Sequence, residues 1–419
     1  MPRKLFAYSW MFALVSILFV FSTATQAVAG GIAVPGQVSP VRLPSVTRLG
    51  PSDPGGADSF GSNVAIEGPL AVVGAANADN SLGAAYVFER ENGVWVERAK
   101  LVASDRSVLS EFGENVKISG NTIAIGAPGE RHETGAVYIF QKTGNQWTEQ
   151  AKLTANDETE FAFFAGSIAL GQDMLVSGAE SGLVPGGVEA GSAYIFRRIG
   201  KSWTQEAKLI ASDATEGAGF GSGAAVINGD TIAIGAAAAQ RSGVVYIFKR
   251  QGGVWSEQSQ LVPSSPEAGQ GFGIDIGSSG NSLVVGAYSA ATTGDVRTGA
   301  AYVFRRAGAA WEEEARLVPP ETQVRLFATR VAISGSTIVA GAPFTDSGTL
   351  EGGSAWVFQR TGNTWETKAK LKAPDATPND VFGGYVAIDG KTILIGAEQA
   401  DAPSGFNEGA SYVFELNGN

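Results

Sequence analysis

One pattern of residues recurs seven times between Phe60 and Phe414, and the spacing inside the pattern hardly changes. Each copy has an aromatic residue followed by Val or Ile and then Phe, at Tyr86, Tyr138, Tyr194, Tyr246, Tyr302, Trp356 and Tyr412. In six copies a tryptophan stands nine residues later, at Trp95, Trp147, Trp203, Trp255, Trp311 and Trp365. An insertion within a paired hairpin would turn every following side chain to the wrong face. The constant spacing therefore predicts one structural unit copied in register.

Each copy has the pattern of four short antiparallel strands. In the second copy, alternating apolar residues predict strands over residues 115–119, 121–126, 135–140 and 147–153. Pairs such as Ser119-Gly120 predict tight hairpins, because glycine accepts a positive φ without steric cost. A single sheet of this kind cannot bury its own apolar faces, so neighbouring sheets have to stack. The sequence therefore predicts an all-β fold, a seven-bladed β-propeller of four-stranded antiparallel blades.

The two ends of the repeat region predict how the ring closes. The last copy stops after its third strand, at Tyr412-Val413-Phe414, and so lacks a fourth. Leu49 precedes Phe60 by eleven residues, which is also the interval from Leu101 to Phe112. We therefore expect residues 43–50 to supply the missing strand, with Leu43 in the place of the tryptophan. Closure of this kind removes exposed sheet edges.

The first 29 residues are typical of a secretory signal peptide. Arg3 and Lys4 precede an apolar stretch over residues 5–21, and Ala27-Val28-Ala29 ends the segment with small residues. We expect cleavage before Gly30, an extended lead-in over residues 30–42 and a propeller over residues 43–419. The alternative is that the apolar stretch is retained as a membrane anchor. After cleavage no stable membrane insertion is expected, which predicts a secreted protein, either periplasmic or extracellular.

The charge and the cysteine count exclude several classes of function. The net charge of −11 becomes more negative without Arg3 and Lys4, which disfavours nucleic acid and anionic lipid as partners. The acidic surface also keeps a secreted β-protein soluble. The chain has no cysteine, so it has neither a lipid-attachment site nor a disulfide framework.

Two short motifs in each copy carry a family resemblance. Phe112-Gly113 begins the second copy, and Gly126-Ala127-Pro128 ends its second strand. Phe-Gly recurs in four other copies, and Ala165 and Ala328 replace the glycine in the remaining two. Gly-Ala is present in all seven copies, at Gly74, Gly126, Gly178, Gly235, Gly286, Gly341 and Gly396. The pattern resembles the FG-GAP repeat of the integrin α-subunit propeller and of bacterial secreted proteins.

Calcium is possible by this resemblance, but the loops that would bind it are absent. Calcium-binding members carry an Asp-rich loop between the first and second strands of a blade. Here all seven of these connections read as hairpins of about two residues. Calcium needs six to eight oxygens, which a longer loop would have to supply. We therefore expect no metal and no other cofactor.

Three sets of residues have both a functional and a structural interpretation. Acidic residues four positions after the fourth-strand leucine could gather cations, or could accept hydrogen bonds from backbone N–H groups of their own turn; they are Asp53, Asp105, Asp157, Asp213, Glu321 and Asp375. The six tryptophans could stack on carbohydrate, but their fixed place favours packing within the blades. His132 is the single histidine, and no Ser or Asp motif lies near it in the sequence. We therefore expect no catalysis.

The connections from second to third strand differ among the copies. From the Gly of Gly-Ala to the aromatic residue the distance is 11 or 12 residues in copies one, two and four, and 15 or 16 in the others. Loops that vary on a constant scaffold are where repeat proteins place specificity. Antiparallel alternation puts them on one face, with the fourth-to-first connections, and in the integrin relatives that face binds the ligand. The candidate residues are Asp79, Arg131, His132, Glu189, Arg241, Asp295, Arg297, Asp346 and Asp401.

The sequence thus predicts a secreted, monomeric recognition or adhesion module that binds a protein or glycan partner on the long-loop face. A rival interpretation is a metal-dependent or hydrolytic propeller with a central cleft, which predicts carboxylates from several copies converging near the axis. A purely structural role in the cell envelope is a third possibility.

Overall fold

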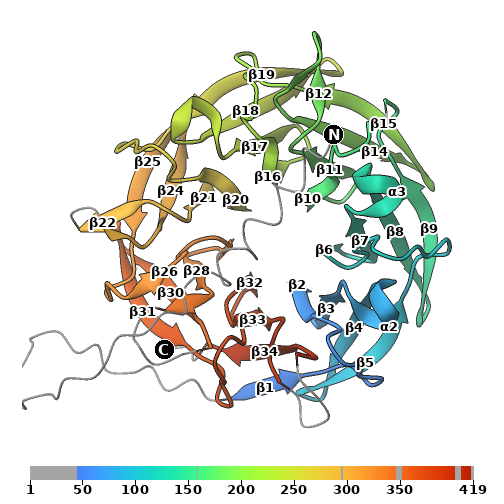
Figure 1. Ribbon diagram of the computed structural model, residues 1–419. Helices are drawn as coiled ribbons and strands as arrows, with labels where there is room; N and C mark the ends of the chain where they lie inside the picture. The colour runs from blue at the N-terminus through green and yellow to red at the C-terminus, as the bar shows by residue number, and fades with distance from the viewer. Residues whose placement is uncertain (1–44, 158, 294–295, 346–351, 402–406, 417–419) are drawn as a thin grey trace, which may run out of the picture. The chain divides into compact units, whose positions relative to one another are not determined.

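The computed structural model describes residues 45–157, 159–293, 296–345, 352–401 and 407–416. By its internal contacts the chain divides into residues 1–39 and residues 40–419, and only the second unit includes described residues. Seven four-stranded antiparallel sheets form this unit and stand as blades around a common axis (Figure 1). The predicted all-β, seven-bladed propeller is confirmed.

The blades follow one another along the chain. Blade 1 contains β2 (Phe60–Glu67), β3 (Leu70–Ala75), β4 (Ala84–Glu91) and β5 (Val94–Leu101). Blade 2 contains β6 (Asn115–Ser119), β7 (Thr122–Ala127), β8 (Ala136–Thr143) and β9 (Gln146–Leu153). Blade 3 contains β10 (Phe164–Leu170), β11 (Met174–Ala179), β14 (Ser192–Ile199) and β15 (Ser202–Leu209). Blade 4 contains β16 (Phe220–Asn228), β17 (Thr231–Ala236), β18 (Val244–Gln251) and β19 (Val254–Leu261).

The remaining blades keep the same order. Blade 5 contains β20 (Phe272–Ser279), β21 (Ser282–Ala287), β24 (Ala300–Ala307) and β25 (Ala310–Leu317). Blade 6 contains β27 (Val331–Ser334), β28 (Thr337–Ala342), β30 (Ser354–Thr361) and β31 (Thr364–Leu371). Blade 7 contains β32 (Tyr385–Asp389), β33 (Thr392–Ala397), β34 (Ala410–Glu415) and β1 (Val46–Leu49). The first strand of each blade lies nearest the axis and the fourth lies outermost (Figure 1).

The ring closes through β1, as predicted. Val46 pairs with Phe414, Arg48 pairs with Tyr412, and Leu49 pairs with Ser411 in an antiparallel ladder. Leu49 is buried in the cluster that also contains Phe60 and Val413. Leu43, the expected signal peptide and the expected lead-in lie outside the described residues. Among the described residues, no helix has the length and apolar character needed to cross a membrane.

The first-to-second connections are tight hairpins in all seven blades, as predicted, and one of them is longer than the others. Between the strand ends lie two residues in six blades, for example Gly120 and Asn121 between β6 and β7. In blade 3 the connection is three residues long, 171–173, which is one residue more than in the other blades. The reason is local: the N–H of Gly171 donates to the carbonyl of Met174, which closes a wider turn.

The conserved spacing of Phe, Tyr and Phe builds the interior of each blade. Phe112 packs edge-on against Tyr138 and Phe140, with ring centroids 5.3 and 6.2 Å apart. Both contacts recur in blades 1, 3, 4, 5 and 7, and in blade 6, where Trp356 replaces the tyrosine, Phe327 packs against Phe358. Contacts between aromatic rings of this kind add stability beyond area burial. The core clusters join residues of neighbouring blades, as where Val72 of blade 1 packs with Val116 of blade 2. No blade buries its faces alone.

Candidate functional site

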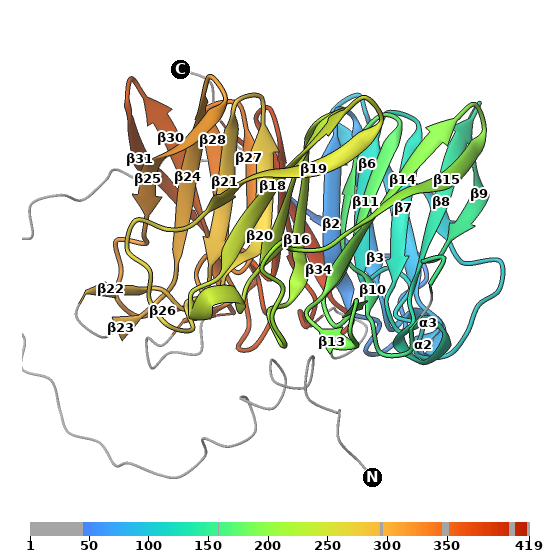
Figure 2. The same cartoon turned by 90° about the horizontal axis from the view of Figure 1, so that it is seen from above.

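The variable connections gather on one face of the propeller. The short second-to-third connections form single turns, α2 (Ala78–Ser81), α3 (Glu130–Glu133) and η1 (Ala239–Arg241). The longer connections of blades 3 and 5 form short ladders, β12 (Leu183–Val184) with β13 (Val188–Glu189) and β22 (Ala291–Thr293) with β23 (Val296–Arg297). In blade 6, β29 (Phe344–Thr345) pairs with β26 (Val324–Arg325) of the preceding fourth-to-first connection. Figure 2 shows these elements on the side opposite the tight hairpins. We name the two sides the long-loop face and the hairpin face.

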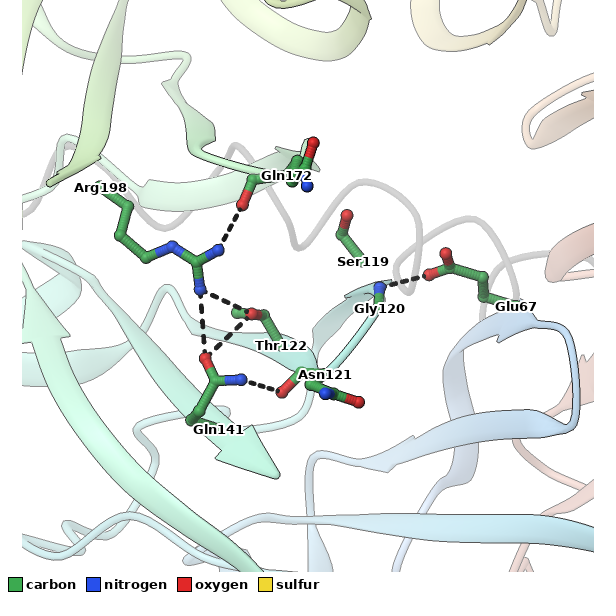
Figure 3. A pocket seen from close by; sticks show the side chains of 8 residues that line it. All are labelled: Glu67, Ser119, Gly120, Asn121, Thr122, Gln141, Gln172 and Arg198. Atoms are coloured by element: carbon green, nitrogen blue, oxygen red, sulfur yellow. Dashed lines mark hydrogen bonds between the residues drawn. The ribbon is translucent and has the colours of Figure 1, made fainter. Parts of the chain in front are cut away.

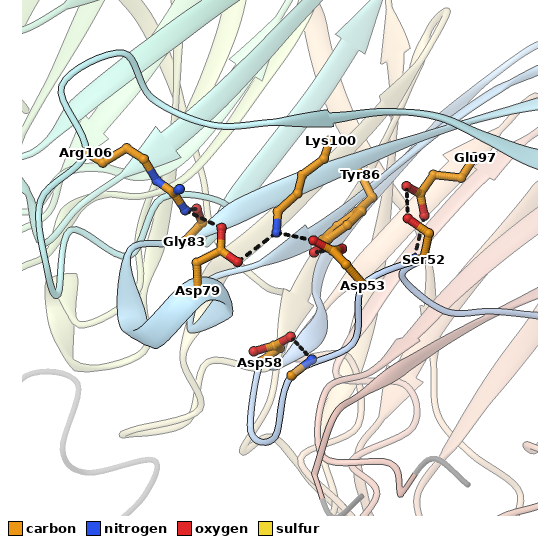
Figure 4. A network of polar contacts seen from close by, with 10 residues as sticks. Ser52, Asp53, Asp58, Asp79, Gly83, Tyr86, Glu97, Lys100 and Arg106 are labelled. Atoms are coloured by element: carbon orange, nitrogen blue, oxygen red, sulfur yellow. Dashed lines mark hydrogen bonds and ion pairs between the residues drawn. The ribbon is translucent and has the colours of Figure 1, made fainter. Parts of the chain in front are cut away.

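Asp79, a predicted binding residue, is tied into its own blade. Its carboxylate lies 2.8 Å from the Nζ of Lys100 and 2.5 Å from the Nη2 of Arg106 (Figure 4). The hydrogen bond from Lys100 is the main reason that the pKa of Asp79 lies below its ordinary value. The charge of Asp79 is therefore compensated by the protein, and its first role is to hold α2 against the fourth strand.

Three of the predicted residues are exposed in strained turns. Arg131 and His132 have φ values of 51° and 59°, and Arg241 has a φ of 67°. All three are exposed on the long-loop face. A left-handed backbone is costly for residues of this size, and such strain is concentrated at functional sites.

The other predicted residues are scattered around the same face. Glu189 is half-buried in β13. Arg297 is exposed and donates to the carbonyl of Ser289 at 3.0 Å, and Asp401 accepts from the N–H of Asn407 at 3.1 Å. Asp295 and Asp346 lie outside the described residues. The structure thus places the described candidates on one face but does not gather them into one cluster.

The recurring acidic residues belong to the fold, although through partners that differ from those predicted. Asp53 accepts from the hydroxyl of Tyr86 at 3.0 Å and from the Nζ of Lys100 at 2.7 Å. The same triad occurs as Asp105 with Tyr138 and Lys152, and Asp375 and Asp213 also accept from their tyrosines. Tyr86 and Lys100 are cross-strand partners, so the carboxylate caps a paired position. The expected bonds to backbone N–H groups of the same turn are not the principal contacts.

The lysine of this triad had a signal in the sequence that the interpretation missed. The residue before the fourth-strand leucine is Lys or Arg in six blades and Gln260 in blade 4. The six cations are Arg48, Lys100, Lys152, Lys208, Arg316 and Lys370. In blade 4, Gln240 takes the place of the cation and donates to Asp213 at 2.9 Å.

The tryptophans pack within and between blades, as predicted. Trp95 and Trp203 are buried, and Trp147, Trp255 and Trp311 are partly buried against core clusters. Trp365 packs in the same way against the cluster of blades 5 and 6. This packing agrees with the structural interpretation of the six tryptophans.

A cluster of ionisable side chains near the axis was not located from the sequence. The hydroxyl of Tyr385 in blade 7 donates to Glu114 in blade 2 at 3.0 Å, although blade 1 stands between these two blades. The guanidinium of Arg330 in blade 6 lies 4.7 Å from the ring centroid of Tyr385 and donates to its hydroxyl at 3.4 Å. The first strands converge at the axis, which brings these side chains of non-neighbouring blades together. We name Glu114, Glu180, Arg330, Tyr385 and Glu398 the axial cluster.

Burial and crowding change the acidity of this cluster. Desolvation, together with repulsion from Glu398 and Glu111, raises the pKa of Glu114 to about 8. Desolvation raises the pKa of Glu398 to about 7, against the attraction of Arg330, and also raises the pKa of Glu180. Among the described residues, no three Asp, Glu or His side chains are placed to hold a metal ion together. The cluster can instead hold and exchange protons.

Comparison with known proteins follows the blade boundaries. The FG-GAP repeat family model matches residues 44–88, 95–140, 147–196, 203–248, 255–304, 311–358 and 365–414. No curated protein matches the chain. A chain in the solved structure titled "Crystal Structure of Mitotic Checkpoint Complex" is similar, with a TM-score of 0.55 and 14% identity over 94% of this chain and 100% of that chain. At that identity the likeness shows the propeller fold alone.

The family match and the blade geometry agree at the motif residues. Phe-Gly begins the first strand and Gly-Ala ends the second strand of the blade, in matched segments that together cover most of the chain. FG-GAP propellers are, in general, interaction modules and are typically non-catalytic. The chain therefore belongs to the FG-GAP repeat family and folds as a seven-bladed FG-GAP propeller.

Proposed function

We propose that this protein is a secreted, non-catalytic recognition propeller that binds a protein or glycan partner on the long-loop face. The observation that carries the proposal is that polar side chains, two of them arginines, project there from a strained backbone. Arg131, His132 and Arg241 project from single-turn loops in a left-handed backbone. All three side chains are exposed.

The distribution of backbone strain supports the choice of face. Apart from Asn92, every described non-glycine residue with a positive φ lies in a second-to-third connection, in a fourth-to-first connection or at the beginning of a first strand. The tight hairpins of the opposite face place glycine where a positive φ is needed, for example at Gly120 and Gly144. The long-loop face thus carries both the strain and the variation in length.

Exposed apolar side chains on the same face favour a macromolecular partner. Val108 and Leu109 are 65% and 68% exposed in the connection between blades 1 and 2. Phe161 is 42% exposed in the next connection, and its N–H donates to the carbonyl of His132. Apolar groups beside charged ones are typical of the centre and rim of an interface.

The test is partner capture with matched variants. The full chain would be used as bait on glycan arrays and on envelope and culture-medium fractions of the source organism. We expect Arg131→Ala, His132→Ala, Arg241→Ala and Arg297→Ala in combination to reduce binding of the captured partner at least tenfold. The control combines Lys201→Ala and Lys391→Ala, two exposed lysines on the hairpin face. Unchanged binding by the long-loop variant, or an equal loss in the control, would contradict the proposal.

The axial cluster favours one second candidate, a hydrolytic propeller. Carboxylates from blades 2, 3 and 7 converge on Arg330, which is the arrangement that this rival requires. A carboxyl with a pKa near 7 or 8 is suited to general acid catalysis. Hydrolysis of a chromogenic glycoside or ester panel that disappears in Glu114→Gln would favour it, and the absence of turnover would leave the recognition function.

A further inference from the structure

Neighbouring blades are linked across the hairpin face by a recurring hydrogen bond. The N–H of the turn glycine in one blade donates to the side chain that precedes the turn in the blade before it. The distances are 2.7 Å from Gly68 to Asp389, 2.9 Å from Gly120 to Glu67, 2.9 Å from Gly335 to Ser279 and 3.0 Å from Gly390 to Ser334. The junctions of blade 4 are closed by other bonds, from Arg197 to the carbonyl of Gly229 and from Ser278 to the carbonyl of Val226.

The link is missing between blades 2 and 3. Ser119 occupies the acceptor position, but the N–H of Gly171 is bonded within its own three-residue turn, to the carbonyl of Met174 at 2.7 Å. The side chain of Ser119 makes no hydrogen bond to any described residue. An open cavity of about 470 Å³ lies at this junction, lined by Glu67, Ser119, Gly120, Asn121, Thr122, Gln141, Gln172 and Arg198. Its volume is within the range of small-ligand sites, about 300 to 1,000 Å³.

In one wall of the cavity, the guanidinium of Arg198 is held by several hydrogen bonds and its charge is already paired. Arg198 donates to Thr122 Oγ1 and Gln141 Oε1, both at 3.2 Å, and to the carbonyl of Gln172 at 3.0 Å. Its charge is balanced by Asp173 at 3.2 Å, and its guanidinium lies 5.8 Å from the ring centroid of Trp203. Figure 3 shows Arg198, Thr122 and Gln141 on one side of the cavity, with Ser119, Gly120 and Glu67 on the other.

The groups that remain available are neutral donors and acceptors. The side-chain amides of Asn121 and Gln172 and the hydroxyl of Ser119 have no partner among the described residues. No apolar side chain lines the cavity, which disfavours lipid and aromatic ligands. The carboxylate of Glu67, which accepts from Gly120, disfavours an anion. From this chemistry we propose that the cavity between blades 2 and 3 is a binding site for a neutral sugar or polyol of about the size of a monosaccharide.

This site is independent of the partner site proposed above, because it lies on the opposite face. The test is saturation-transfer NMR on the full chain with D-glucose, D-galactose, N-acetyl-D-glucosamine and myo-inositol as separate probes. We expect saturable binding of at least one of them in the millimolar range, as for a small, wet site without stacking surfaces. D-glucuronate and inorganic phosphate should not compete.

Deletion of Gln172 gives the decisive variant. It shortens the turn of blade 3 to the two residues found in the other blades, so the N–H of Gly171 can reach Ser119 as Gly335 reaches Ser279. We expect the cavity to close and the saturable signal to be lost, whereas the control Ser334→Ala should retain the signal. If the deletion variant does not fold, Asn121→Ala with Gln172→Ala should weaken binding at least fivefold. Binding of none of the four probes, preferential binding of phosphate, or equal binding by the cavity variants would overturn the proposal.

Discussion

The glycine of Gly-Ala in one blade lies against the glycine of Phe-Gly in the next blade. A Cβ placed on Gly178 of blade 3 would lie 2.0 Å from the carbonyl oxygen of Gly221 in blade 4. Gly74 and Gly235 are similarly placed against Gly113 and Gly273, at 1.9 Å in both cases. The Gly of Gly-Ala therefore provides the space that the following Phe-Gly backbone occupies. Where Ala replaces the second glycine, Ala165 and Ala328 still take the positive φ, at 74° and 61°.

Gly178→Ala should therefore destabilise the propeller. Neither backbone can move without shifting a blade, so we expect a loss of about 3 kcal/mol in the free energy of unfolding. Gly229→Ala is the matched control, because a Cβ there meets nothing within 4 Å. Its effect should stay within about 0.5 kcal/mol. Urea unfolding measures both, and equal stabilities would show that the junction can relax.

The axial cluster should make stability depend on pH. The pKa of Glu114 is about 8 in the folded protein, against an ordinary value of 4.5, so the folded protein holds the proton more tightly than the unfolded chain. Stability from this group is fully present below the unfolded pKa and is lost as the pH rises through 8. Glu398 acts in the same direction, with a folded pKa of about 7.

Glu114→Gln should flatten this dependence, because glutamine stays neutral and can still accept from the hydroxyl of Tyr385. Unfolding measured at intervals from pH 5 to pH 9 should give a smaller decline for the variant than for the wild type. The exposed Glu216 supplies the control, Glu216→Gln. Parallel curves for Glu114→Gln and the wild type would contradict the assigned pKa.

At the scale of the strand, β1 is the fourth strand of blade 7, although it comes from the opposite end of the sequence to the other three strands of that blade. Four residues of β1 cover the outer edge of β34, and Leu49 is only 3% exposed. Without β1, the edge of β34 would be free to pair with other chains. A short segment therefore controls both closure and solubility.

Two truncations test this role. A chain beginning at residue 43 should unfold like the full chain, because it keeps β1. A chain beginning at residue 51 should lose at least the 2 to 5 kcal/mol typical of removing a buried leucine side chain, and should aggregate at micromolar concentration. Light scattering and thermal unfolding distinguish the two, and equal behaviour would mean that β1 is dispensable.

The sequence predicted the elements that repeat, since repetition fixes the register. The strands, their order and the pairing of residues 46–49 with the last blade follow from spacing alone. What it could not predict are features of single copies that need positions in space. Lys117 and Arg330 stand where other copies have different residues, but only coordinates show that Arg330 meets Tyr385. Likewise, nothing in the sequence marks Ser119 as having lost its partner to a longer turn.

For the whole molecule, the described residues are held together by packing between neighbouring blades. There is no cysteine in the chain, and the described residues contain no group of Asp, Glu or His suited to a metal. We expect the unfolding temperature to be the same in millimolar calcium and in EDTA. A rise of several degrees with calcium would revive the metal-dependent rival, and would direct attention to residues 346–351 and 402–406.

The pairing of Val46 with Phe414 brings the two ends of the propeller together, so the chain can be circularly permuted. A short turn from residue 416 to residue 45 would complete an ordinary third-to-fourth hairpin in blade 7. New ends could then be opened in the corresponding hairpin of any other blade, for example at Gly144, where a Cβ would meet nothing within 4 Å. Circular permutants of this kind should keep the same ring and would allow either face to be tethered to a surface or fused to a second domain.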